Sequence, residues 1–110
     1  MAANVIFIGS DHVVAWEGAT GDGTYLNAAT VGYALLDAGG TAVTVSGTPV
    51  TGTLDYVADS NGDYRGTIES TVTGTLRNGA QYLLDVTLVQ APFDDKRRLR
   101  VYASYRSGNP

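Results

Sequence analysis

The chain has 110 residues, a formal net charge of −4 and 14 glycines, with one histidine and no cysteine. This length fits a single domain, taken as residues 1–110, and the composition excludes disulfides, a cysteine nucleophile, a cysteine zinc site and a multi-histidine metal site within one chain. The charge is unevenly divided: residues 1–64 carry seven acids and no Lys or Arg, whereas residues 65–110 carry all seven cations and four acids. A split of −7 against +3 favours assembly through complementary surfaces.

The first predicted element is a short apolar strand at residues 4–8. No cation precedes this run, and it is too short for the apolar region of a signal peptide or for a membrane span, which needs about 20 residues. We therefore expect no signal peptide and no membrane partner. The protein is expected to be made in a cytoplasm and kept there or packaged into a larger particle.

Turn residues at regular intervals divide the rest of the chain into short apolar or alternating segments. The predicted strands are 4–8, 12–17, 30–37, 41–46, 52–58, 63–69, 80–90 and 97–106. This pattern is typical of an all-β sandwich or barrel. Asn61-Gly62 is interpreted as a two-residue hairpin link, since both residues tolerate positive φ. A short helix within 25–38, ending before Gly39, is the alternative for that segment.

Alternation along the last two strands separates a core face from an outer face. The predicted core positions are Tyr82, Leu84, Val86 and Leu88 of segment 80–90, and Leu99, Val101, Ala103 and Tyr105 of segment 97–106. The opposite face of the last strand carries Arg98, Arg100, Tyr102, Ser104 and Arg106. Arg and Tyr are enriched at binding hot spots, so this face is predicted to be a protein interface; the alternative is an ordinary polar face.

The first strand is a second candidate for protein contact. Its apolar residues, with Val5 and Phe7 among them, would let residues 4–8 add to the sheet edge of a partner.

No catalytic, cofactor-binding or metal-binding residues are predicted, and an enzyme is not expected. Segment 59–63 resembles the start of a calcium loop, but Tyr64 and Ser70 occupy the positions where Gly and Glu are needed, so it is interpreted as a turn. Ser10, Asp11 and His12 are adjacent on one strand and would point to alternate faces, unlike a catalytic triad. Asp94 and Asp95 stand beside cations and are interpreted as part of a solvated loop.

Two further ligand classes would fit parts of the sequence. The basic segment 96–100, with Tyr102 and Tyr105 nearby, would suit nucleic acid, but the chain is acidic, with a pI near 4.6, and repels phosphate. Direct nucleic-acid binding is therefore not favoured. Trp16 and the seven tyrosines would suit a sugar platform, although Trp16 is read more simply as a core or rim residue.

Several segments together resemble small immunoglobulin-like structural proteins of tailed-phage and prophage virions. They are residues 5–9, 25–31, 35–37, 54–57, 61–68 and 79–82. The resemblance covers roughly residues 4–90, including a Gly-x-Tyr-x-Gly hairpin and a Gly-x-x-Tyr strand. It implies a single immunoglobulin-like antiparallel β-sandwich of about seven or eight strands.

The functional implication of the resemblance is a non-enzymatic virion protein: a head decoration, a head–tail junction, or a tail or baseplate component. Its partners would be capsid or tail proteins and copies of itself, and it would be made in the host cytoplasm. The alternative is an immunoglobulin-like module that binds carbohydrate or a host surface, with calcium-stabilised adhesion as one form.

Overall fold

The computed structural model describes residues 4–106, which fold into β-strands with one short helix. The domain expected over residues 1–110 thus includes two short terminal stretches outside the described part. The elements are β1 (Asn4–Phe7), β2 (His12–Trp16), β3 (Thr20–Gly21), β4 (Thr24–Tyr25), β5 (Thr30–Asp37), β6 (Thr44–Val45), β7 (Thr48–Pro49), β8 (Thr51–Tyr56), β9 (Tyr64–Ile68), α1 (Ser70–Thr73), β10 (Gln81–Gln90) and β11 (Phe93–Ser104).

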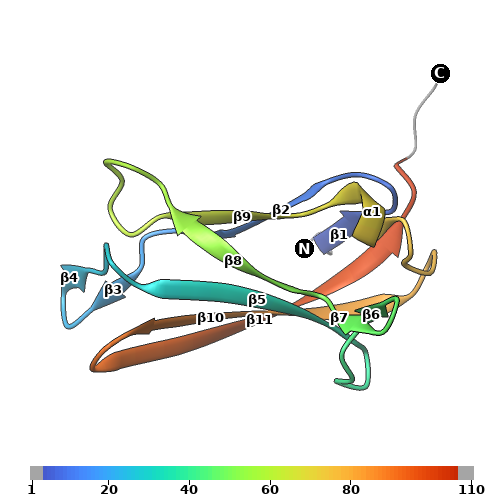
Figure 1. Ribbon diagram of the computed structural model, residues 1–110. Coiled ribbons are helices and arrows are strands. Elements are labelled where there is room, and N and C mark those ends of the chain that lie inside the picture. Colours follow the sequence, from blue (N-terminus) through green and yellow to red (C-terminus); the bar gives the residue numbers. More distant parts are fainter. Residues whose placement is uncertain (1–3, 107–110) are drawn as a thin grey trace.

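Seven of these strands form one mixed sheet in the order β1-β11-β10-β5-β8-β9-β2. The sheet folds over into two layers, because β8 pairs with β5 through residues 51–54 and with β9 through residues 55–56. Figure 1 shows β8 running diagonally from the layer of β5, β10 and β11 to the layer of β2 and β9. The remaining short strands form two separate hairpins, β3–β4 and β6–β7.

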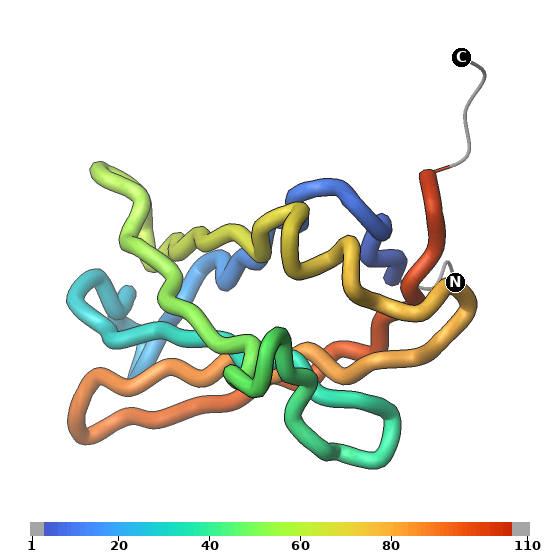
Figure 2. The backbone as a smooth tube through the Cα atoms, turned by 45° about the vertical axis from the view of Figure 1, so that its right-hand side comes forward, coloured from blue at the N-terminus to red at the C-terminus, as the bar shows by residue number. Residues whose placement is uncertain are grey.

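The predicted all-β sandwich is confirmed. Most pairs are antiparallel, and β1 departs from the expected arrangement by pairing in parallel with the end of β11. Figure 2 follows the chain from the first strand, in dark blue, to the end of β11, in red, on the same side of the molecule. The alternative helix within 25–38 is wrong, because residues 30–37 form a central strand with buried Val31 and Leu35.

The core fills the space between the two layers. The largest fully buried side chains are Trp16, Tyr64, Ile6, Leu35, Ile68, Leu84 and Leu88. The predicted core face of β10 is confirmed, and Val101 and Ala103 of β11 are also buried. Leu99 and Tyr105 were expected inside but are 41% and 63% exposed. Leu99 lies where β11 has a neighbour on one side only, and Tyr105 follows the end of the strand.

The β10–β11 hairpin corrects the predicted boundary of the last strand. Segment 94–96 was expected in a loop, but β11 begins at Phe93 and pairs with β10 along its whole length. Backbone hydrogen bonds to β10 hold this charged segment extended, although both of its faces are accessible to water. Such a segment lacks the apolar alternation from which a strand is predicted.

The predicted two-residue turn at Asn61-Gly62 is wrong. β8 ends at Tyr56 and β9 begins at Tyr64, so a longer loop joins them, and only Gly62 of the pair has positive φ. The Gly62 N–H donates to Asn27 Oδ1 at 2.8 Å, and the Gly62 carbonyl accepts from the Ala19 N–H at 2.8 Å. Packing against the segment before β5 therefore decides the shape of this loop.

The Gly-x-Tyr-x-Gly motif has a structural explanation in these contacts. A Cβ atom at Gly62 would lie 2.5 Å from the Ala19 carbonyl oxygen, and one at Gly66 would lie 2.5 Å from the Thr53 carbonyl oxygen. Between them, the buried Tyr64 hydroxyl donates to the Leu26 carbonyl at 2.7 Å and accepts from the Ala29 N–H at 2.9 Å. The motif joins three chain segments at close range.

The turn that leads into β10 is held by a tyrosine side chain. The Arg77 N–H donates to the Tyr82 hydroxyl at 2.9 Å. A tyrosine at the start of this strand that bonds back to the preceding turn is a tyrosine corner. The short helix α1, which the sequence did not predict, begins where Asp11 Oδ1 accepts from the Ser70 N–H at 2.7 Å.

Candidate functional site

The predicted interface residues of β1 and β11 come together on the outer face of the sheet. The parallel register places Val5 opposite Tyr102 and Phe7 opposite Ser104. Side chains of paired residues project from the same face. Ile6, between them, is fully buried, so Val5 and Phe7 point away from the core. Val5 is 37% exposed and Tyr102 is 41% exposed, which leaves an aliphatic and an aromatic side chain together in solvent.

Two arginines border this pair. The Arg106 guanidinium lies 4.2 Å from the centroid of the Phe7 ring, a cation–π contact. Arg106 was predicted in the last strand, but β11 ends at Ser104 and Arg106 follows it. Arg100 is exposed and pairs with Leu83 of β10. We call the surface formed by these side chains the β1–β11 face; it consists of Val5, Phe7, Arg100, Tyr102 and Arg106.

Arg98, also predicted at the interface, is bound within its own chain. Its Nε and one Nη donate to the two carboxylate oxygens of Asp85 at 2.7 and 2.9 Å, and Lys96 Nζ lies 3.3 Å from the same carboxylate. The hydrogen bonds from Arg98, with help from Lys96, hold the pKa of Asp85 below its usual value although burial opposes this. The hydrogen bonds to Asp85 in turn raise the pKa of Arg98. Arg100 is therefore the better-placed cation for an external partner.

A cavity of about 160 Å³ lies on the other side of β11. Its lining combines an apolar part with a charged rim and includes Trp16, Leu26, Leu88, Phe93, Asp94, Asp95 and Arg97. The Arg97 guanidinium lies 4.2 Å from the centroid of the Trp16 ring. Sequence reasoning missed this contact, because the partners lie far apart in the chain and meet only when the sheet folds over.

The position of Trp16 bears on the carbohydrate alternative. Its side chain is 2% exposed, which confirms a core position. A sugar-stacking platform needs an accessible ring face, and Arg97 and the core cover this one. Of the tyrosines that would suit such a platform, Tyr25, Tyr56, Tyr102 and Tyr105 are exposed, so carbohydrate binding would depend on these rings and not on Trp16.

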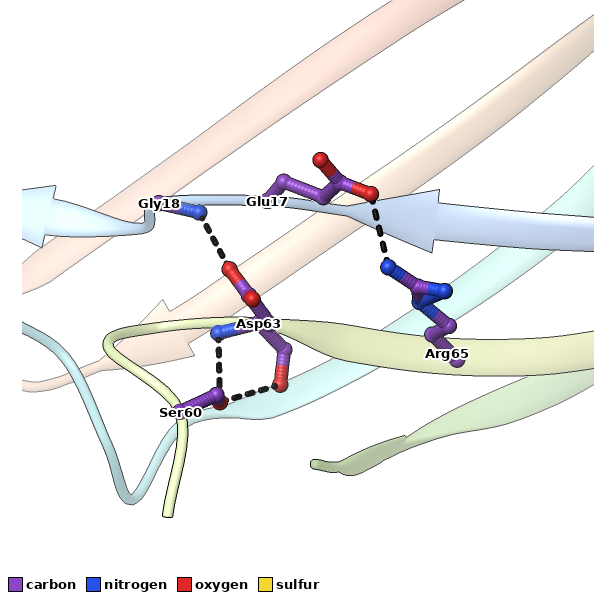
Figure 3. Close-up of polar contacts among 5 residues, drawn as sticks. All are labelled: Glu17, Gly18, Ser60, Asp63 and Arg65. Carbon is purple, nitrogen blue, oxygen red and sulfur yellow. Dashed lines mark hydrogen bonds and ion pairs between the residues drawn. The ribbon is translucent and has the colours of Figure 1, made fainter. Parts of the chain in front are cut away.

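The segment that resembled a calcium loop uses its oxygen atoms to hold turns together (Figure 3). Asp63 Oδ1 accepts from the Gly18 N–H at 2.9 Å, and the Ser60 hydroxyl accepts from the Asp63 N–H at 3.2 Å. Beside them, Glu17 and Arg65 form an exposed ion pair at 2.8 Å. Within residues 4–106, no group of three or more His, Cys, Asp or Glu side chains is placed to hold a metal ion.

The Ser10-Asp11-His12 segment has structural contacts. The Asp11 carboxylate accepts from the Ser70 N–H, and the Ser10 carbonyl accepts from the Thr73 hydroxyl at 2.7 Å. Burial lowers the pKa of His12. These three residues form no arrangement of nucleophile and base, since Asp11 binds backbone instead of the imidazole.

Four of the seven acidic side chains in residues 1–64 make hydrogen bonds or ion pairs within the chain. Asp11 and Asp63 accept backbone hydrogen bonds as described, and Asp37 Oδ1 accepts from two N–H groups of the turn after β5 at 2.9 Å. Glu17 is paired with Arg65. Of these four carboxylates, Glu17 alone is paired with a cation in the described structure, so the backbone hydrogen bonds orient the other three without cancelling their negative charge.

No protein-family model, curated protein or solved structure matches the chain. Across the part of the chain that the structure describes, no helix has the length and apolar character needed to cross a membrane.

Proposed function

We propose that the protein is a non-enzymatic structural component of a tailed-phage virion that docks on neighbouring proteins. It would serve as a head decoration, a head–tail junction, or a tail or baseplate protein. The resemblance of roughly residues 4–90 to small immunoglobulin-like virion proteins supports the virion role. The observation that carries the docking role is the exposed pair of Val5 and Tyr102 beside Arg100.

The β1–β11 face suits protein docking for three physical reasons. Aromatic and Arg side chains contribute most to hot spots, and Tyr102 and Arg100 are two positions apart on one strand. Paired strands hold these side chains on a firm backbone, which limits the entropy lost on binding. Contact with Phe7 restrains Arg106 before a partner arrives. The partner is a capsid or tail protein with acidic groups around an apolar patch.

The test is incorporation into particles. A variant carrying Arg100→Glu and Tyr102→Ala is expressed in place of the wild-type chain, and its copy number relative to the major capsid protein is measured in gradient-purified virions. We expect at least a tenfold loss of occupancy, since a hot-spot residue contributes about 2 kcal/mol or more. Arg98 is left unchanged because its removal would leave Asp85 without its principal partner.

The matched control is Arg65→Glu, which makes the same charge change on β9 in the other layer. Its occupancy should stay within about twofold of the wild type, a difference of less than half a kcal/mol. Circular dichroism melting curves check that both variants fold. Wild-type occupancy of the folded double variant would refute docking through this face, and absence of the wild-type protein from virions would refute the virion role itself.

A further inference from the structure

The N-terminal part of β11 has a hydrogen-bonding edge without a neighbouring strand. β10 pairs with one side of β11 along its length, whereas β1 pairs with the other side only at residues 101–104. Within the described structure, residues 93–100 therefore form part of the boundary of the sheet. Figure 1 shows β1 beside the C-terminal end of β11, far from the β10–β11 turn.

The backbone groups at this edge can be assigned. Ala103 faces β10, because its N–H donates to the Ala80 carbonyl and its carbonyl accepts from the Gly79 N–H. Ser104 faces the β1 side, where its carbonyl accepts from the Ile8 N–H. The register between β10 and β11 continues without a bulge, so the direction alternates along the strand. The N–H and C=O groups directed to the free edge are those of Asp94, Lys96, Arg98 and Arg100. The Lys96 N–H donates to Asp95 Oδ1 at 2.8 Å, a contact that pairing with a second strand would replace.

The side chains along this edge are self-complementary. Residues 93–99 read Phe-Asp-Asp-Lys-Arg-Arg-Leu, with the acids before the arginines. If a second copy pairs antiparallel about a two-fold axis at Lys96, Asp95 faces Arg97 of the second copy, and Asp94 faces Arg98. Phe93 then faces Leu99 of the second copy. Every such contact occurs twice in a two-fold interface.

Neighbouring registers lack this match. Paired residues must share a face of the sheet, so the axis passes through a residue. Centring the axis on Arg97 would place Arg97 against itself and Lys96 against Arg98 of the second copy. Centring it on Asp95 would place that carboxylate against itself and Phe93 against Arg97. A parallel copy in register would oppose like charges throughout, whereas the register about Lys96 opposes like charges only at Lys96.

We propose that two copies of the chain join through the free edges of β11, antiparallel about Lys96, so that their seven-stranded sheets become continuous. Charges on an edge strand usually discourage pairing, but here their order selects a copy of the same strand. Arg98 keeps Asp85 and gains Asp94 of the second copy, since a guanidinium has five N–H donors. The proposal goes beyond virion docking and uses the edge of β11, so each can fail without the other.

Analytical ultracentrifugation of the full chain from about 1 to 300 µM tests the proposal. The wild-type chain should form dimers that weaken as salt is raised. Asp95→Arg and Arg97→Asp should each raise the dimer Kd about tenfold, because each opposes like charges twice. Combining both changes in one chain should restore the dimer, and an equimolar mixture of the two single variants should form a heterodimer.

Cross-linking tests the register. Lys96→Cys places the single thiol of each copy beside its equivalent, with Cα atoms about 5.5 Å apart, so a short bis-maleimide should link two chains. Arg100→Cys is the matched control, because its equivalents would lie about 26 Å apart. Lys96→Pro should abolish the dimer while keeping the pairing to β10, since its N–H points to the free edge.

Three results would overturn the proposal. The first is a wild-type monomer over the whole concentration range. The second is a dimer whose Kd is unchanged in folded Asp95→Arg and Lys96→Pro variants, which would place the contact elsewhere, such as the edge of β2. The third is equal cross-linking of the two cysteine variants. Rescue in the mixture requires folded chains, so recovery there also excludes misfolding as the cause of dissociation.

Discussion

The hydroxyl of Tyr64 makes a testable contribution to the stability of the sandwich. Tyr64 is 1% exposed, and its hydroxyl satisfies the Leu26 carbonyl and the Ala29 N–H at 2.7 and 2.9 Å. The change Tyr64→Phe keeps the ring and removes both hydrogen bonds. Each buried backbone group left without a hydrogen-bond partner costs about 1–1.5 kcal/mol, so we expect Tyr64→Phe to lower the free energy of unfolding by about 2–3 kcal/mol. For a chain of this size, this lowers Tm by about 10 °C.

Thermal and urea unfolding followed by circular dichroism measure this loss. The matched control is Tyr25→Phe, because Tyr25 is 49% exposed and its change should alter Tm by no more than about 1 °C. A loss of less than about 0.5 kcal/mol in Tyr64→Phe would refute the reasoning. It would mean that water or a rearranged loop satisfies Leu26 and Ala29.

Two further predictions concern packing and pH. Gly66→Ala should lower the free energy of unfolding in urea by about 2–3 kcal/mol, because its Cβ would lie 2.5 Å from the Thr53 carbonyl oxygen. The control Gly39→Ala, whose Cβ would have its nearest contact at 3.4 Å, should lower it by less than about 0.5 kcal/mol. Asp85→Asn should lower stability at pH 7 by at most about 1 kcal/mol, because Arg98 is half-exposed. Because the pKa of Asp85 is depressed, the difference in unfolding free energy between the wild type and Asp85→Asn should persist above about pH 4. It should vanish as the pH falls through the lowered pKa of Asp85. A constant difference from about pH 7 to about pH 2 would contradict the ion pair.

The central strands were predictable because burial imposes a clear pattern on them. β5 and β10 lie between other strands, and their predicted core residues, Val31 and Leu35 of β5 and Tyr82, Leu84, Val86 and Leu88 of β10, are buried. Leu83 and Asp85 of β10, which alternation assigned to the opposite face, are buried as well. The start of β11 was not predictable in this way. Its neighbour on one side is β10 and its other edge is free, so charged residues at 94–98 meet water on both faces and resemble a loop.

Long-range contacts explain the other differences. Asn61-Gly62 has the local chemistry of a tight turn, but Asn27 and Ala19 hold Gly62 in a longer loop. The pairing of Arg98 with Asp85 needed the register of β10 and β11, which alternation alone does not supply.

The candidate site was predictable in part. Alternation placed Arg98, Arg100 and Tyr102 on one face, and the structure agrees. Val5 lies beside Tyr102 because the first and last strands pair in parallel. No local pattern reports such pairing, because the residues involved come from opposite ends of the chain.

The parallel pair of β1 and β11 also determines how the protein would respond to mechanical tension. Both strands run in the same direction, with Asn4 opposite Val101 and Phe7 opposite Ser104. A force that separates the two ends of the chain pulls Asn4 and Ser104 in opposite directions along the strands. The hydrogen bonds between the strands then bear the load in shear and must break together. A protein held by its two ends within a particle would thus resist stretching more strongly than one whose terminal strands peel apart bond by bond.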